Sequence, residues 1–258
     1  MSDLDSESID EGQIDPQDLR PIDRAEMLVL ARTEYRRVLE LLDDLDEEEW
    51  SLPTDCEGWE VRDIVAHLAG TAAANASLRE NRRQIVSGRR LARRHDLHDL
   101  DGINRLQVDS RRHLSPAELR HSLARAAPNA VRGRYRTPRV LRRLRAANPA
   151  GGTMTLGFLV DIVYTRDQWM HRIDIARATE RPIELSTEHD GRIVADIVRQ
   201  WAAEHDEPID LRLTGPAGNR FQRGQASMAF ELDAVEFCRG LSGRTSLPEG
   251  LPDNEVPF

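Results

Sequence analysis

Two side chains four residues apart could hold a metal ion together. Asp167 and His171 are the two ends of DQWMH, within an apolar stretch that we predict to be a buried helix. Residues four apart on a helix share one face, with Cβ atoms about 5–6 Å apart. A carboxylate oxygen and an imidazole nitrogen aimed at one point are two ligands for a divalent metal. The alternative is an ordinary buried pairing of Asp167 with His171 or with a neighbouring arginine.

A third ligand would have to come from another helix, and His67 is the best candidate. It lies in GWEVRDIVAHLAG, where apolar residues recur at helical spacing and place His67 beside Ile64 and Leu68. A single histidine on such a face is more often a core residue that is hydrogen-bonded to a neighbour. From spacing alone, the core role is the simpler interpretation of His67.

The elements that must position these residues are helices. Apolar periodicity predicts a first helix over 22–45 and a second that begins near Glu60 and continues to about Gly88. Ser115, followed by a proline and then a glutamate three residues on, has the pattern of a helix start, and Pro128 should end or kink that helix. A long helix that contains Asp167 and His171 follows.

The last third of the chain combines helices with short strands. A helix over about 187–204 precedes an alternating apolar segment at 209–213, which is typical of a strand, and another helix begins at Asp233. We therefore predict an α+β protein that is mainly α, in four segments. They are a disordered acidic tail (1–20), a helical domain (21–183), a small α+β domain (184–246) and a C-terminal tail (247–258).

Composition restricts the function classes. The chain has 258 residues and a formal net charge of -9, which argues against general affinity for nucleic acid. It contains no lysine, so lysine-based catalysis is excluded. The acidic N-terminus and the absence of a long apolar run lead us to expect a cytoplasmic protein without a membrane span. An arginine-rich stretch at 132–145 could bind anions, although a solvated charged face is the simpler interpretation.

Several motifs together resemble one known family. They are WSLPTDCEGW at 50–59, VRDIVAHLAG at 61–70, DQWMHRIDI at 167–175 and DAVEFCRGLSGR at 233–244. Their order and spacing are similar to those of the mycothiol-dependent maleylpyruvate isomerase family. The resemblance implies a DinB-like four-helix bundle followed by a small α+β C-terminal domain.

The resemblance also implies a metal site with three protein ligands. Carried over to this chain, the ligands of a divalent metal, usually zinc in the family, are His67, Asp167 and His171. Asp167 stands where the family more often has a glutamate, and its side chain is one methylene shorter. Asp174 could orient one of the ligands.

The implied activity is that of a metal-dependent isomerase or S-transferase that uses mycothiol or a similar thiol. Arg220 and Arg223 are candidates for binding a carboxylated small-molecule substrate, and no catalytic residue can be assigned. Cys56 precedes the second helix, where a thiol can become more reactive, but a packing role is the simpler interpretation. A non-catalytic metal-binding protein with a structural or regulatory role is the main alternative. We expect a monomer or a homodimer.

Overall fold

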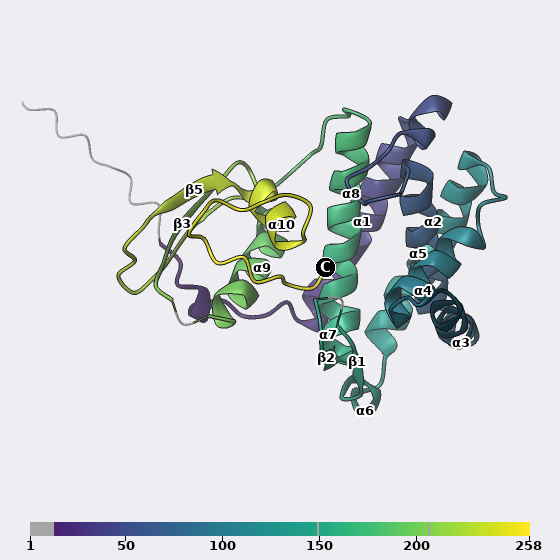
Figure 1. Cartoon of the computed structure of the whole chain (residues 1–258), viewed down its shortest axis with the longest axis horizontal. Coiled ribbons are helices and arrows are strands. Elements are labelled where there is room, and N and C mark those ends of the chain that lie inside the picture. Colours follow the sequence, from purple (N-terminus) through teal and green to yellow (C-terminus); the bar gives the residue numbers. More distant parts are fainter. Residues whose placement is uncertain (1–12, 149, 206) are drawn as a thin grey trace, which may run out of the picture. The chain divides into compact units, whose positions relative to one another are not determined.

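The computed structural model describes residues 13–148, 150–205 and 207–258, and it is mainly helical with two small sheets (Figure 1). The chain divides into two compact units. One is formed by residues 22–184 with residues 257 and 258, and the other by residues 185–256 with the described residues up to Pro21. The helical first unit and the small α+β second unit confirm the predicted fold class.

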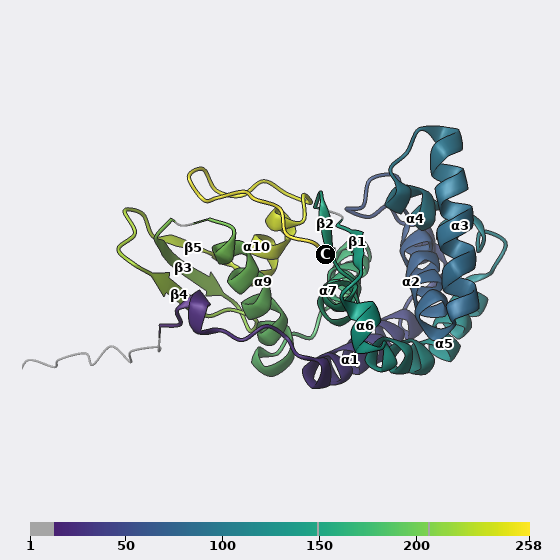
Figure 2. The same cartoon turned by 90° about the horizontal axis from the view of Figure 1, so that it is seen from below.

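Four helices pack against one another as the bundle of the first unit (Figures 1 and 2). They are α1 (Arg24–Asp43), α2 (Val61–Ala76), α5 (Pro116–Arg136) and α8 (Tyr164–Ala178). Helix α2 packs most extensively against α5, α1 contacts both α5 and α8, and α2 also contacts α8. Thus α2 and α8, which carry the candidate metal ligands, are direct neighbours.

The helix starts follow the capping rules that the sequence suggests. The Asp23 carboxylate accepts hydrogen bonds from the backbone N–H groups of Ala25 and Glu26, at 2.7 and 2.9 Å, and so begins α1. Ser115 and Glu118 form the expected capping box at the start of α5. Helix α5 then continues through Pro128, where the sequence predicted an end or a kink. Pro128 is exposed, so water can solvate the backbone groups that the proline leaves unpaired.

The helix expected from Glu60 to Gly88 is in fact two helices. Helix α2 ends at Ala76, and Ser77 adopts an extended conformation and caps α3 (Leu78–His95) through its hydroxyl. Helix α3 pairs with α4 (Asp99–Asp109). Gly88, predicted to end the helix, instead lies against Gly102 of α4, where two glycines let the helices approach closely.

An irregular segment leads into α8. It consists of α6 (Arg139–Arg142), the paired strands β1 (Arg145–Ala147) and β2 (Thr153–Thr155), α7 (Leu156–Phe158) and a π-helical turn (Leu159–Val163). The buried Arg134 fixes this turn, because it donates hydrogen bonds to the Val160 carbonyl and to the Thr165 hydroxyl. Arg142 forms an ion pair with Asp161. Two arginines of the 132–145 stretch therefore have structural partners inside this unit.

The second unit is built on a three-stranded sheet. Its strands are β3 (Ile209–Thr214), β4 (Arg220–Arg223) and β5 (Phe230–Asp233), in the order β4-β3-β5. Strand β3 is antiparallel to β4 and parallel to β5, with Leu211 opposite both Phe221 and Phe230. A π-helical turn (Thr187–Gly191), α9 (Arg192–Ala203) and α10 (Ala234–Leu241) complete the unit.

The described residues of the expected N-terminal tail up to Arg20, and residues 247–256 of the expected C-terminal tail, belong to this second unit. Ile14 pairs with Phe221 of β4, and a 3-10 turn follows at Pro16–Asp18, so these residues of the expected acidic tail are folded. Residues 1–12 of that tail lie outside the described residues. In the C-terminal segment Leu251 and Val256 are buried, and the Trp201 indole N–H donates to the Pro252 carbonyl.

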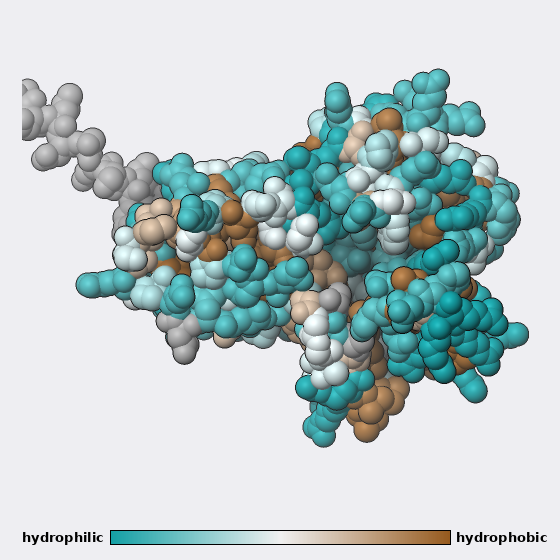
Figure 3. Space-filling model, viewed as in Figure 1, coloured by the Kyte–Doolittle hydropathy of each residue, from teal (hydrophilic) through white to brown (hydrophobic). Residues whose placement is uncertain are grey.

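The surface of the bundle unit is largely hydrophilic in the view of Figure 3, apart from a hydrophobic patch around α6. The exposed apolar side chains there are Val140, Leu141 and Leu144. Within the described parts of the chain, no helix has the length and apolar character that a bilayer crossing would need.

Candidate metal centre

Helices α2 and α8 bring the three candidate ligands together. His171 Nε2 lies 3.4 Å from Asp167 Oδ1, and His67 Nε2 lies 3.5 Å from Asp167 Oδ2. One donor atom of each residue lies within 4.8 Å of the other two. Asp167 and His171 share a face of α8, as their spacing predicts, and His67 faces them from α2.

A buried ion pair connects α8 to α1. The Arg172 guanidinium donates to both oxygens of the Glu34 carboxylate, at 2.9 and 3.1 Å, and both side chains are buried. Such a bidentate pair fixes the orientation as well as the distance of its partners. Arg172 directly follows His171 in the sequence, so this ion pair limits rotation of α8 about its own axis at the position of His171.

The donor atoms suit a divalent metal. Both ring nitrogens of His67 and Oδ2 of Asp167 are buried without a hydrogen-bond partner among the described residues. Unpaired buried polar atoms are costly and call for an explanation such as an ion. Two ligands of a tetrahedral zinc, each about 2.1 Å from the metal, would lie about 3.4 Å apart. Each of the two nitrogen–oxygen separations is close to that spacing, although they end on different oxygens of Asp167.

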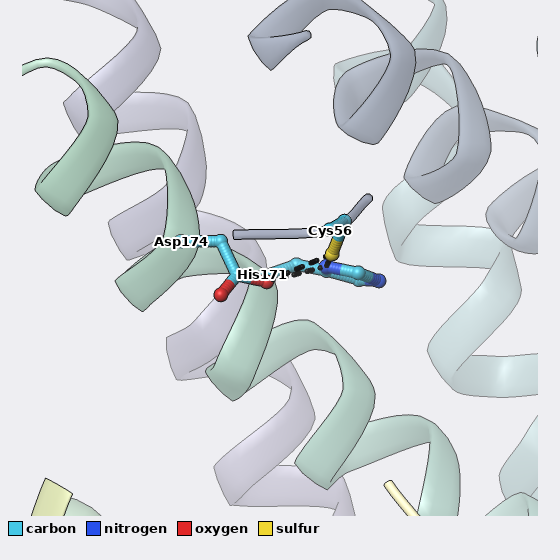
Figure 4. Close-up of side chains that lie close together, drawn as sticks. All are labelled: Cys56, His171 and Asp174. Carbon is cyan, nitrogen blue, oxygen red and sulfur yellow. Dashed lines mark hydrogen bonds and ion pairs between the residues drawn. The ribbon is translucent and has the colours of Figure 1, made fainter. Parts of the chain in front are cut away.

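His171 has a second set of partners on the other side of its ring (Figure 4). Its Nδ1 lies 3.0 Å from Oδ2 of Asp174, whose side chain is fully buried. The Cys56 thiol donates to the same Asp174 oxygen at 3.4 Å and lies 3.8 Å from His171 Nδ1. Asp174, predicted to orient a ligand, is therefore placed to do so for His171.

The loop before α2 delivers Cys56 and Trp59 to the site. It follows a 3-10 turn (Glu47–Ser51) and is closed by a bridge between Pro53 and Glu60. Inside it, the Thr54 hydroxyl donates to the Trp59 carbonyl and accepts from the backbone N–H of Cys56. The threonine side chain thus fixes the turn that directs the thiol towards α8.

The Trp59 ring covers the two histidines. Its centroid lies 5.3 Å from that of His67 and 6.2 Å from that of His171, with which it is stacked. The two imidazole rings meet edge to face at 5.2 Å. An indole at this position limits the access of water to the histidine rings.

The pKa values of Asp167 and His171 are shifted in opposite directions. Burial by itself would raise the pKa of the Asp167 carboxyl, but His171 and His67 hold it well below its usual value. Burial would lower the pKa of His171, but Asp167, with help from Asp174 and Cys56, raises it well above the usual value. Without a metal, a carboxylate therefore faces an imidazolium.

Two tyrosines that are not candidate ligands, Tyr164 and Tyr35, are electrostatic neighbours of Asp167. Burial, followed by the nearby Asp167 charge, raises the pKa of Tyr164 to about 12. Burial also raises the pKa of Tyr35 to about 12, although Arg134 opposes the shift. Both phenols stay neutral at physiological pH and add no charge to the site.

The predicted substrate-binding arginines lie on β4 in the second unit. Arg223 donates to the backbone carbonyls of Ala202, His205 and Glu207, whereas Arg220 lies 3.6 Å from an Asp210 oxygen. Arg223 therefore has a structural role at the end of α9, and Arg220 keeps more of its donors available.

The chain matches known proteins along most of its length. Residues 31–176 match the family described as the mycothiol maleylpyruvate isomerase N-terminal domain. The solved structure of a mycothiol-dependent maleylpyruvate isomerase is similar at 19% identity and a TM-score of 0.56, over 95% of this chain and 98% of that chain. The solved structure of a histidine-to-alanine mutant of a mycothiol-dependent maleylpyruvate isomerase is similar at 18% identity and a TM-score of 0.56, over 91% of this chain and 93% of that chain. These likenesses show a shared fold. No curated protein matches the chain.

Proposed function

Since the chain belongs to the mycothiol maleylpyruvate isomerase N-terminal domain family, we propose that it is a divalent-metal-dependent enzyme of the isomerase or S-transferase type that uses a low-molecular-weight thiol. The metal would be held by His67, Asp167 and His171. The observation that supports this proposal is the meeting of two histidines and a carboxylate, among which both His67 ring nitrogens and Oδ2 of Asp167 are buried without a hydrogen-bond partner in the described part of the chain. Zinc suits this donor set, and mycothiol or a similar thiol is the proposed cosubstrate.

Asp174 prepares His171 for binding a metal. Once the Nε2 proton has been displaced by metal binding, a hydrogen bond from Nδ1–H to the buried carboxylate would keep the other proton on Nδ1 and leave the Nε2 lone pair for the ion. The carboxylate is in turn oriented by the Cys56 thiol. This chain of contacts lets the imidazole ring bind without losing rotational freedom at that moment.

Three protein ligands leave room for a reactant. A site with three ligands is typical of catalytic rather than structural metal centres. A bound divalent ion would lower the pKa of a thiol or of water and so supply a nucleophile at neutral pH. Asp167, whose side chain keeps 18% exposure, lies on the accessible side, and Trp59 shields the histidine rings. A thiolate held there would add to an electron-poor C=C bond of a carboxylated substrate, forming a C–S bond and a carbanion. Rotation about the resulting single bond and expulsion of the thiolate would give the isomer, whereas protonation of the carbanion would leave the sulfur attached as an S-adduct.

The substrate carboxylate needs a cation. Arg220 and Arg223 remain our candidates, and Arg220 is the better one because Arg223 already donates to three carbonyls. We further propose a cytoplasmic protein that acts on small molecules as a monomer or homodimer.

Metal analysis tests this proposal. Protein purified without added metal or a histidine tag should contain about one divalent ion per chain, and His171→Ala should lose it. His121→Ala, which alters an exposed histidine in the same unit, is the matched control and should keep the metal. No metal in the wild type after reconstitution with zinc, nickel and manganese would overturn the proposal.

A non-catalytic metal-binding role is the second candidate. It is favoured by the low exposure of the site, since the His67 and His171 side chains are only 7% and 9% exposed. Metal-loaded protein should be assayed with mycothiol and maleylpyruvate and with other electrophilic acids. Turnover that requires both thiol and metal supports the enzyme, whereas bound metal without turnover supports the second candidate.

A further inference from the structure

An apolar and basic patch lies on α6 and at its two ends, and it takes no part in the candidate metal centre. Its exposed apolar side chains are Val140, Leu141 and Leu144. Its exposed basic side chains are Arg136, Arg139, Arg143 and Arg145. We call these residues the α6 patch. An exposed apolar group with a polar rim is typical of an interaction surface.

The α6 patch projects from the bundle unit. Helix α6 lies at the edge of this unit, beyond the end of α7 (Figures 1 and 2). Hydrophobic and hydrophilic residues adjoin on this projection (Figure 3). Val140 is 71% exposed and Leu144 is 54% exposed. A flat surface can therefore contact these side chains together, whereas a small molecule would be enclosed on one side only.

Arg142 holds α6 in place from the inner side. It forms an ion pair with Asp161, and it donates hydrogen bonds to the carbonyls of Thr137 and Arg134, at 3.1 and 3.0 Å. These contacts fix the backbone that carries the α6 patch. A surface that is already ordered loses less conformational entropy when it binds a partner.

Positive and apolar side chains alternate on the outer side of α6. The chain stays coiled past the end of the helix, because Arg143 has right-handed helical backbone angles and the Leu144 N–H donates to the Leu141 carbonyl. Arg139 and Arg143 are four residues apart, and so are Val140 and Leu144, so the members of each pair lie above one another. Each exposed apolar side chain of these pairs therefore has an arginine beside it.

The arginines of the α6 patch form a local excess of positive charge. Residues 119–160 contain nine arginines and no aspartate or glutamate, in a chain whose formal net charge is -9. The side chains of the four patch arginines make no hydrogen bond or ion pair with another residue that the structure describes. Their guanidinium groups are therefore available to an external anion.

An anionic phospholipid bilayer fits both parts of the α6 patch. Arginines near a membrane surface are attracted to anionic headgroups, and apolar side chains beside them can enter the boundary between headgroups and acyl chains. A nucleic acid would use the arginines alone, because its phosphate backbone offers no apolar layer for Val140 and Leu144. An acidic protein segment would need a groove to cover the apolar side chains, and the patch projects instead. Charge and shape together favour a lipid surface.

We propose that the α6 patch binds the surface of bilayers that contain anionic phospholipids. Val140, Leu141 and Leu144 enter the headgroup region, and the four arginines bind lipid phosphates. The same surface repels the acidic remainder of the chain, so the field of the whole protein turns the patch towards the bilayer. The proposal does not rest on the proposed function, because no residue of the patch is a candidate metal ligand.

Vesicle sedimentation with the full chain tests the charge requirement. Wild-type protein should sediment with phosphatidylcholine vesicles that contain about one-third phosphatidylglycerol, and not with vesicles of phosphatidylcholine alone. Each arginine near an anionic surface increases partitioning about fivefold, so Arg139→Gln with Arg143→Gln should reduce it about 25-fold at low salt. The matched control is Arg90→Gln with Arg94→Gln, which removes two exposed charges from α3 and should reduce partitioning less than about threefold.

Salt separates the apolar contribution from the ionic one. Val140→Ser with Leu144→Ser should reduce partitioning about tenfold. This ratio should be the same at about 0.05 and 0.5 M NaCl, because salt does not screen apolar contacts, whereas the effect of the arginine variant should shrink. Leu78→Ser with Val86→Ser alters two exposed apolar side chains of α3 and should bind as the wild type does. All these positions are exposed, so the variants should keep the circular dichroism spectrum of the wild type.

The outcomes decide between the α6 patch and other kinds of surface. No sedimentation, equal sedimentation with both kinds of vesicle, or equal losses in the α6 and α3 variants would overturn the proposal. Stronger binding of duplex DNA or polyglutamate that is unchanged by Val140→Ser with Leu144→Ser would also overturn it, because it would identify a surface for nucleic acid or an acidic protein. His171→Ala should bind vesicles as the wild type does, so a protein without metal or turnover can still confirm the patch.

Discussion

Asp174 is fully buried, and its carboxylate lies 3.0 Å from Nδ1 of His171, on the side of the ring opposite Asp167. The imidazole thus lies between two carboxylates, one at each nitrogen. His67 belongs with Asp167 and His171 to the candidate ligand group. The ring is therefore oriented by Asp174 and is available for a ligand on the Asp167 side.

Replacing Asp174 should weaken metal binding while leaving all three ligands in place. In Asp174→Asn the side chain keeps its shape but loses the charge that makes the imidazole a better donor. We expect affinity for zinc to fall about 10–100-fold, measured by competition with a chromophoric chelator. Unchanged affinity in a folded variant would show that Asp174 does not act through His171.

The Cys56 thiol should contribute a smaller part of the same effect. Cys56→Ala removes one hydrogen bond from the buried Asp174 carboxylate and should reduce zinc affinity about two- to tenfold. Cys56→Ser keeps a donor at this position and should stay close to the wild type. If alanine and serine reduce affinity equally, the thiol binds the metal or packs the loop, and its hydrogen bond is not what matters.

The sequence predicted the site best where its residues share one helix. Asp167 and His171 are four apart on α8, so local geometry alone brings them together. His67 and Cys56 reach them from an adjacent helix and a loop, and this depends on tertiary packing that spacing does not contain. His67 was assigned by resemblance to a family. Cys56 was given a packing role as the simpler interpretation, and its contact with Asp174 spans 118 positions, which spacing along the chain cannot predict.

The fold class was predictable, but one helix boundary was missed despite a local signal. Ser77 is followed three positions later by Glu80, which is the pattern of a capping box. The good helix formers on both sides concealed it, and α2 and α3 were predicted as one helix. Gly88 was misassigned because its close partner, Gly102, lies on another helix.

Metal uptake should depend on pH with a defined sign. Asp167 and Asp174 raise the pKa of His171, so the metal-free site holds a proton on this ring at neutral pH. Binding must displace that proton, whereas the lowered pKa of Asp167 means that this carboxylate is already ionised. Zinc affinity should rise about tenfold per pH unit below the pKa of His171 and become constant above it.

Calorimetry in buffers of different ionisation enthalpy measures this proton release. About one proton per metal should appear below the pKa of His171. Asp174→Asn removes a partner that raises the pKa of His171, so in this variant zinc affinity should become constant at a lower pH than in the wild type. An affinity that does not change between about pH 6 and pH 8 would contradict a protonated His171 in the metal-free protein.

The close contact between α3 and α4 should make the stability of the protein sensitive to side-chain size at Gly102. A methyl group at Gly102 would overlap the Gly88 carbonyl oxygen and lie 2.6 Å from the Ala92 side chain. Gly102→Ala should therefore lower the free energy of unfolding by about 1–3 kcal/mol through overpacking, although alanine favours helices. Urea denaturation followed by circular dichroism measures the difference. Arg90→Ala, at an exposed position of α3, is the matched control and should change stability by less than about 0.5 kcal/mol. Equal stability of Gly102→Ala and the wild type would show that the two helices can separate at little cost.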